Sequence, residues 1–181
     1  QNLVENNINV VAVITAPDKP KGRGKKLGMS AVKEYALTAN LPILQPTNLK
    51  SPKFLEELES YHADLQIVVA FRMLPVAVWD MPRLGTFNLH ASLLPQYRGA
   101  APINWAIING EKETGVTTFF LKHEIDTGAI IYQESEPILE GDNVGSLYEK
   151  LMNKGADLVL KTVKAIEADD YPQIEQEAHS D

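Results

Sequence analysis

Asn88 and His90 are separated by a single residue within residues 85–91, a short apolar run that predicts a β-strand. Side chains at positions i and i+2 of a strand project from the same face, so an amide and an imidazole are expected side by side near the end of this strand. Such a pair combines a hydrogen-bond donor with a group that can exchange protons. A polar pair on a buried strand is costly unless it is hydrogen-bonded or functional, so both a catalytic pair and a structural His satisfied by a neighbour are open interpretations.

Asp126 is a second candidate acid or base, because it lies in the turn 125–128 between two predicted strands. Its carboxylate could orient a His, or it could cap its own turn by accepting a backbone hydrogen bond. The connection 92–102, which follows the Asn88/His90 strand, contains two prolines, Arg98 and Gly99. A loop constrained in this way either shapes a site or merely reverses the chain direction.

A basic segment stands out in residues 17–28, where five cations fall within eight positions: Lys19, Lys21, Arg23, Lys25 and Lys26. It is not a phosphate-binding P-loop, because no Ser or Thr follows Gly24-Lys25. It is not a dinucleotide-binding fingerprint either, because Gly22, Gly24 and Gly28 have one residue too many between them. Two interpretations remain, a flexible loop that contacts a polyanion and a plain solvated loop.

Composition limits the remaining chemistry. The chain has 181 residues with 44% apolar residues, enough for one substantial core, and no run approaches the roughly 20 apolar residues of a membrane-spanning helix. Its 17 basic and 24 acidic residues give a net charge of −7, which argues against a domain that binds nucleic acid over its whole surface. Cysteine is absent, which excludes disulfides and thiolate nucleophiles and suits a reducing cytosol. The other histidines, His62, His123 and His179, lack metal-ligand spacing, so no metal site is expected.

The elements that must position these residues alternate between strand and helix. Apolar runs predict strands at 10–15, 42–45, 65–70, 85–91, 114–121 and 129–137, and helical spacing predicts helices at 30–40, 51–61, 75–79, 102–109 and 144–168. The last two strands could be mixed or antiparallel. This order predicts an α/β fold with an open, mostly parallel sheet, whose ligands bind beyond the carboxyl ends of the strands. The apolar stripe after residue 70 (Phe71, Met73, Leu74 and Val76) fits either a core or a pocket wall.

Three motifs together resemble the signature of the folate-dependent formyltransferases: Asn88-Leu-His90, Ser92-Leu-Leu-Pro-Gln-Tyr-Arg-Gly-Ala100 and Asp126-Thr-Gly128. The resemblance runs from about residue 10 to residue 166 and implies a Rossmann-like sheet with helices on both faces. It is strongest to the catalytic domain of those members that formylate methionyl-initiator tRNA, because residues 17–27 are similar to the loop with which they contact the tRNA acceptor end.

The resemblance also implies roles for particular residues. Asn88, His90 and Asp126 match the catalytic Asn, His and Asp of the family. Four apolar residues match the wall that receives the pteridine of 10-formyltetrahydrofolate, the formyl donor: Phe71, Met73, Leu74 and Leu121. The implied contacts to initiator Met-tRNA are Lys19, Lys21, Arg23, Lys25, Lys26 and Arg98.

The family pattern begins with a strand that would precede Gln1 and, in the tRNA-directed members, continues into a further domain. We therefore expect residues 1–168 to form a catalytic domain and residues 169–181 to begin a linker, in a cytoplasmic enzyme. Two alternatives stay open. One is formyl transfer to another amine, such as an amino sugar or glycinamide ribonucleotide, against which the basic segment argues. The other is a noncatalytic nucleic-acid-binding module, against which the net charge argues.

Overall fold

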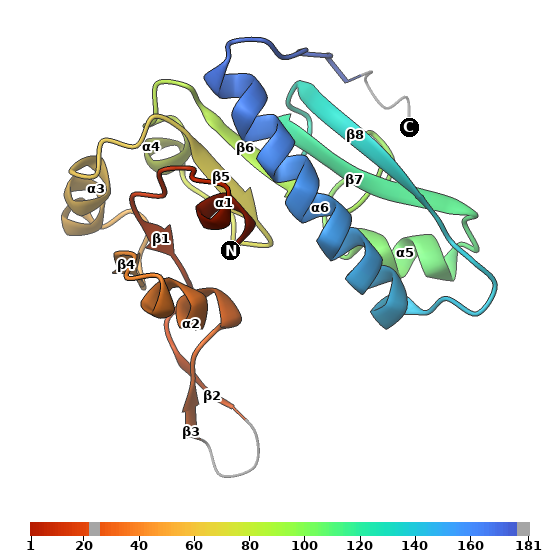
Figure 1. The fold of residues 1–181 in the computed structure, drawn as a ribbon, viewed down its shortest axis with the longest axis horizontal. Helices are drawn as coiled ribbons and strands as arrows, with labels where there is room; N and C mark the ends of the chain where they lie inside the picture. Colours follow the sequence, from red (N-terminus) through yellow and green to blue (C-terminus); the bar gives the residue numbers. More distant parts are fainter. Residues whose placement is uncertain (22–25, 177–181) are drawn as a thin grey trace. The chain divides into compact units, whose positions relative to one another are not determined.

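The computed structural model describes residues 1–21 and 26–176 of the chain (Figure 1). They form two compact units, the first made of Gln1–Ala63 with Leu74–Met81 and the second of Asp64–Met73 with the chain from Pro82 onward. Strands and helices alternate along the sequence, which confirms the predicted α/β class. Among the helices of the described residues, none combines the length and the apolar character that crossing a bilayer requires.

The first unit contains a parallel pair of short strands, β1 (Val13–Ile14) and β4 (Ile43–Leu44). The sequence predicted longer strands here, but only two positions of each segment are in register with the other. The helices of this unit are α1 (Asn2–Glu5), α2 (Ala31–Thr38), α3 (Pro52–Glu59) and α4 (Val76–Trp79). Ser30 begins α2 as predicted, since its hydroxyl accepts a hydrogen bond from the Lys33 backbone N–H at 3.2 Å.

The basic segment contains a β-hairpin rather than only a loop, which corrects the prediction from sequence. Strand β2 (Lys19–Lys21) runs antiparallel to β3 (Lys26–Gly28), and Lys19 pairs with Gly28. Lys, Gly and Pro are weak strand formers, so propensity gave no sign of this pairing. Arg23 and Lys25 lie outside the described residues.

A network of polar side chains anchors the residue that precedes this hairpin. The Lys33 ammonium donates to Asp18 Oδ2 at 2.6 Å and to Gln45 Oε1 at 2.8 Å. The Gln45 amide in turn donates to Asp18 Oδ1 at 2.9 Å. These hydrogen bonds connect Asp18 to α2 and to the segment after β4. The backbone position from which the hairpin begins is therefore fixed.

The second unit is a four-stranded sheet in the order β5-β6-β7-β8 (Figure 1). Its elements are β5 (Gln66–Val69), β6 (Thr86–His90), α5 (Pro102–Ile108), β7 (Glu113–Phe120), β8 (Ile130–Pro137) and α6 (Val144–Glu167). Strands β5 and β6 are parallel, whereas β6–β7 and β7–β8 are antiparallel. The structure thus decides the direction of the last two strands, which the sequence left open, and the sheet is mixed.

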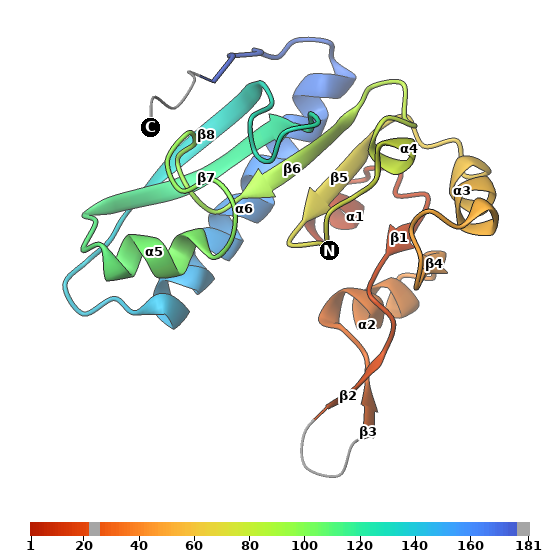
Figure 2. The ribbon, with the colours of Figure 1, turned by 180° about the vertical axis from the view of Figure 1, so that it is seen from behind.

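Helix α6 covers one face of this sheet. On that face, Leu89 of β6 packs so closely that a Cβ on Gly155 of α6 would lie 2.7 Å from its side chain. The core there is formed by Val116, Leu147, Leu151 and Leu158. Because side chains alternate along a strand, the residues on either side of Leu89 project from the opposite face. Figure 2 shows that face, over which the connections β6–α5 and β7–β8 lie.

The segment after α6 lies against the sheet, where the sequence predicted a polar linker. Ile174 and Ile130 form an antiparallel bridge, with N–H to C=O distances of 2.8 and 2.9 Å. The Tyr171 ring also packs against Phe120, with ring centroids 5.9 Å apart. Ile130 belongs to β8, which is an edge strand of the sheet. The backbone groups of an edge strand can pair with a segment of any side-chain composition, so the polar composition of this segment did not reveal the contact.

Candidate active site

Asn88 and His90 project from the sheet face opposite α6, as their spacing predicted. The cross-strand partners of Asn88 and His90 on β7 are Phe119 and Thr117. His90 is only 7% exposed, and its ring meets the Phe119 ring edge-on with centroids 6.5 Å apart. The Asn88 side-chain oxygen is buried and has no hydrogen-bond partner among the described residues. Burying an amide oxygen without a partner is costly, so this atom is suited to accept an N–H from a ligand.

The two ring nitrogens of His90 face different groups. Nε2 lies 2.7 Å from the Tyr97 backbone oxygen, and Nδ1 lies 3.7 Å from Asp126 Oδ2. A carbonyl oxygen only accepts hydrogen bonds, so Nε2 carries a hydrogen in the neutral ring. The proton that the ring can gain or lose is therefore the one at Nδ1, on the side of the carboxylate.

Asp126 lies in the β7–β8 connection with a left-handed backbone, at φ 55°. Its Oδ2 accepts a hydrogen bond from the Gly99 backbone N–H at 2.8 Å, and its side chain is 12% exposed. The carboxylate thus faces His90 and the β6–α5 connection. Of the two interpretations from sequence, the geometry favours orientation of a His over capping of the local turn.

The β6–α5 connection holds both ends of the His–Asp pair. Tyr97 and Gly99 have positive φ values of 56° and 87°, a conformation that costs energy for a residue such as Tyr. This path aims the Tyr97 carbonyl at His90 and the Gly99 N–H at Asp126. The loop is tied to the sheet by Thr117, whose hydroxyl donates to Ser92 O at 2.6 Å. The rigid loop seen in the sequence therefore shapes the site.

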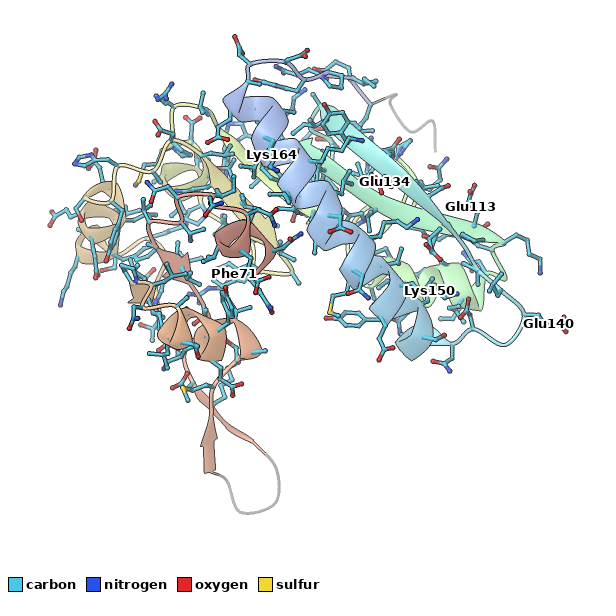
Figure 3. The ribbon with its side chains drawn as sticks, in the orientation of Figure 1. Phe71, Glu113, Glu134, Glu140, Lys150 and Lys164 are labelled. Carbon is cyan, nitrogen blue, oxygen red and sulfur yellow. The ribbon has the colours of Figure 1, made fainter. Side chains whose placement is uncertain are left out.

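Within the second unit, the residues predicted to line a folate wall lie at two different places. Phe71 (labelled in Figure 3) and Met73 follow β5, which is parallel to β6, so they lie at the sheet edge where His90 ends β6. Met73 is 73% exposed. Leu121 is beside the start of β6, because its N–H donates to Thr86 O at 2.8 Å. Leu74 belongs to the first unit.

The predicted tRNA contacts also fall into separate groups. Lys19, Lys21 and Lys26 belong to the β2–β3 hairpin of the first unit. Arg98 belongs to the second unit, where its guanidinium donates to Gln176 Oε1 from two nitrogens. A tRNA contact by Arg98 stays a prediction.

Sequence reasoning missed three groups at this site: the Tyr97 carbonyl, the Gly99 N–H and the Gln176 side chain. The first two are backbone groups, which carry no residue-type signal. Gln176 lies in a segment without periodicity. Of the other histidines, His179 lies outside the described residues, and the described residues contain no group of three or more His, Asp or Glu side chains that could hold a metal ion.

Comparison with known proteins decides the family. A profile described as formyl transferase matches residues 1–163. The chain belongs to the formyl transferase family. Methionyl-tRNA formyltransferase of Bacteroides thetaiotaomicron is similar to it, with 64% identity over 177 residues that make up 98% of this chain and 55% of the relative. The chain thus spans about half the length of the curated relatives that it matches.

Solved structures of the family share the fold. Phosphoribosylglycinamide formyltransferase from Streptococcus pneumoniae superposes with a TM-score of 0.76 at 20% identity, covering 92% of this chain and 91% of that one. WlaRD, a sugar 3N-formyl transferase whose structure was determined in the presence of dTDP and 5-N-formyl-THF, has a TM-score of 0.73 at 25% identity and covers 98% of this chain and 61% of its own. Both support the assignment of a Rossmann-like formyltransferase fold.

Proposed function

We propose that this protein is an enzyme that transfers the formyl group of 10-formyltetrahydrofolate to the amino group of methionyl-initiator tRNA. The name of relatives that are 64% identical supports this substrate. The observation that carries the chemistry is the orientation of His90, whose Nε2 is held by Tyr97 O while Nδ1 faces the Asp126 carboxylate. The unsatisfied Asn88 oxygen on the same sheet face marks a place for a ligand.

The proposed reaction joins the amine nitrogen to the formyl carbon and breaks the bond from that carbon to a folate nitrogen. The oxyanion that forms on the formyl group needs donors, which the Asn88 amide and the N–H at His90 Nδ1 supply. The departing folate nitrogen takes its proton from His90 Nδ1. The proton shed by the attacking amine goes to Asp126, directly or through one water, and the negative Asp126 stabilises the charged imidazole before transfer. The folate brings the activated carbon, and the protein supplies position and electrostatics.

For the formyl donor, we propose that Phe71 and Met73 form the wall, because both follow β5 and lie where the parallel strand β6 ends at His90. The exposure of Met73, at 73%, supports this role because an exposed apolar side chain gains by covering a flat heterocycle. The Arg72 guanidinium lies over one face of the Phe71 ring, 5.6 Å from its centroid.

For the tRNA, we propose the β2–β3 hairpin as the contact, through Lys19, Lys21, Arg23, Lys25 and Lys26. The concentration of five cations in a chain with net charge −7 supports it, because phosphates are bound mainly by Lys and Arg. The Asp18–Lys33–Gln45 network gives the hairpin a fixed root. An enzyme with these substrates would work in the cytoplasm. An amino sugar or glycinamide ribonucleotide as the acceptor is the alternative.

A comparison of acceptors in the full-length protein tests this proposal. With 10-formyltetrahydrofolate as the donor, we expect kcat/KM for methionyl-initiator tRNA to exceed that for a nucleotide-linked amino sugar or glycinamide ribonucleotide by at least ~100-fold. Replacing Lys19, Lys21 and Lys26 by Gln should weaken tRNA binding and flatten its salt dependence by up to about 0.7–0.9 log units for each phosphate that the hairpin no longer binds.

The matched control replaces Lys50 and Lys53, two exposed lysines of the same unit, by Gln and should leave the salt dependence unchanged. Preferred transfer to either small amine would contradict the assignment of tRNA as the acceptor. Binding of tRNA without transfer to any acceptor would favour the nucleic-acid-binding module instead.

A further inference from the structure

The side-chain amide of Gln176 uses all of its hydrogen-bonding capacity on three residues of the two candidate active-site loops. Its oxygen accepts from Arg98 Nε at 3.1 Å and from Arg98 Nη2 at 2.8 Å. Its nitrogen donates to the backbone oxygens of Asp126 at 2.9 Å and Gly128 at 2.8 Å. An amide has two acceptor sites and two N–H donors, so none is left over.

Arg98 determines which way this amide points. If the amide were turned over, its NH2 group would meet the guanidinium donors, and its oxygen would meet two carbonyl oxygens. Both contacts would be repulsive, so the arrangement has a single favourable orientation. Arg98 therefore fixes Gln176, and Gln176 fixes the two carbonyls of the β7–β8 connection.

The loop that Gln176 holds is the one that carries the Asp126 carboxylate. Asp126 has a positive φ of 55°, a conformation that persists only where the surroundings enforce it. Asp126 is held at two places: its carboxylate accepts a hydrogen bond from the Gly99 N–H at 2.8 Å, and its backbone oxygen accepts one from the Gln176 amide. The Ile130–Ile174 bridge brings Gln176 to this position.

We propose that Gln176 is a positioning residue, which keeps the Asp126 carboxylate facing His90 Nδ1 by holding the backbone of its loop. This inference rests on the proposed function. A second contact between the same two segments, the ion pair Lys122–Glu175 at 2.7 Å, is 49% and 73% exposed and contributes little because solvent screens it. The part-buried Gln176 amide therefore contributes most of the contact between these two segments.

The variant Gln176→Glu in the full-length protein tests the inference. It retains an oxygen for Arg98 but loses both N–H donors, so that a carboxylate oxygen would face the carbonyls of Asp126 and Gly128. We expect kcat to fall by about 10- to 100-fold, since a misplacement of about 1 Å has effects of this size, while KM stays within about 3-fold. The matched control is Gln173→Glu, an exposed Gln in the same segment with the same change in charge, which should keep the kcat of the unaltered protein.

Hydrogen exchange gives a readout that does not depend on activity. The Gly99 amide donates to Asp126 Oδ2, so its exchange rate reports whether the carboxylate stays in place. We expect this amide to exchange about 10-fold faster in Gln176→Glu, and at the unaltered rate in Gln173→Glu. The uncharged variant Gln176→Met, which is similar in length, should show the same acceleration and covers the case in which Gln176→Glu does not fold.

A double-mutant cycle separates positioning from general stability. If Gln176 acts through Asp126, then Gln176→Met should lower kcat by less than about 2-fold in the Asp126→Asn background. Equal losses in both backgrounds would overturn the inference, as would an unchanged kcat and Gly99 exchange rate in a folded Gln176 variant. Full turnover in Asp126→Asn itself would instead contradict the proposed function, so the two failures are distinguishable.

Discussion

His90 shows how backbone groups can decide what a side chain does. The alternation of a strand predicted that Asn88 and His90 share a face, and a turn predicted that Asp126 follows a strand end. Strand alternation and turns depend on residue type and spacing, so both can be predicted from sequence. The Tyr97 carbonyl that holds Nε2 has no such signal, because any residue has a carbonyl and only the path of the loop brings this one to within 2.7 Å. The side chains of the candidate site were therefore predictable, and the proton-bearing nitrogen was not.

Gly128 lies where the β7–β8 connection passes very close to the backbone of Phe120. A Cβ at this position would lie 1.6 Å from the Phe120 backbone oxygen, so Ala would force the β7–β8 connection to move. We expect Gly128→Ala to reduce the free energy of unfolding by about 3 kcal/mol or more, measured by urea denaturation.

The matched control for this prediction is Gly110→Ala. Gly110 has a positive φ of 67°, and no atom lies within 4 Å of the point that a methyl group there would occupy, so only conformational strain of about 1–2 kcal/mol is expected. Equal losses in the two variants would show that the close approach to Phe120 does not constrain the loop.

The N-terminus of α6 is capped by reciprocal hydrogen bonds between Asn143 and Ser146. The Asn143 side chain accepts from the Gly145 and Ser146 N–H groups at 2.8 and 3.1 Å, and the Ser146 hydroxyl accepts from the Asn143 N–H at 3.0 Å. Asp142, which precedes the cap, accepts from the Lys150 ammonium at 2.7 Å (Lys150 is labelled in Figure 3). Asn143 is therefore the N-cap of α6.

The pKa of Asp142 makes the stability of this helix start depend on pH. The hydrogen bond from Lys150, with further ones from the Leu139 N–H and the Ser146 hydroxyl, lowers the pKa of Asp142 from 3.8 to about 2. A lowered pKa in the folded state stabilises the protein above the unfolded value of about 3.8, and this contribution is lost as the pH falls through about 2. We expect the difference in unfolding free energy between the unaltered protein and Asp142→Asn to shrink over that range in urea titrations. A difference that stays constant with pH would contradict the assignment.

Elements were predictable from sequence where a cap or a periodic pattern marked them. Ser30 and Ser51-Pro52 begin α2 and α3 as expected, and α6 follows its apolar stripe. The β2–β3 hairpin was not predictable, because its Lys, Gly and Pro residues do not favour strands. The contact of residues 171–176 with the sheet was not predictable either, because it depends on backbone pairing at Ile174 and on one Gln side chain.

The two sites proposed for this chain belong to different units. The cationic hairpin belongs to the first unit, and the Asn88, His90 and Asp126 side chains belong to the second. If the hairpin is the tRNA contact, as proposed, the net charge of −7 favours contact with one region of a nucleic acid over binding along its length. The motifs that carry the family resemblance were readable from sequence, whereas the division into two units was not.

The turnover of single and double variants in the full-length protein tests the central claim most directly. His90→Ala, Asp126→Asn and Asn88→Ala should each lower kcat for formyl transfer to methionyl-initiator tRNA by about 100-fold or more. Because His90 and Asp126 act as a pair, the double variant should be little slower than the slower of its two single variants. A rate near that of the unaltered protein in any single variant, or losses for His90 and Asp126 that multiply, would contradict the account.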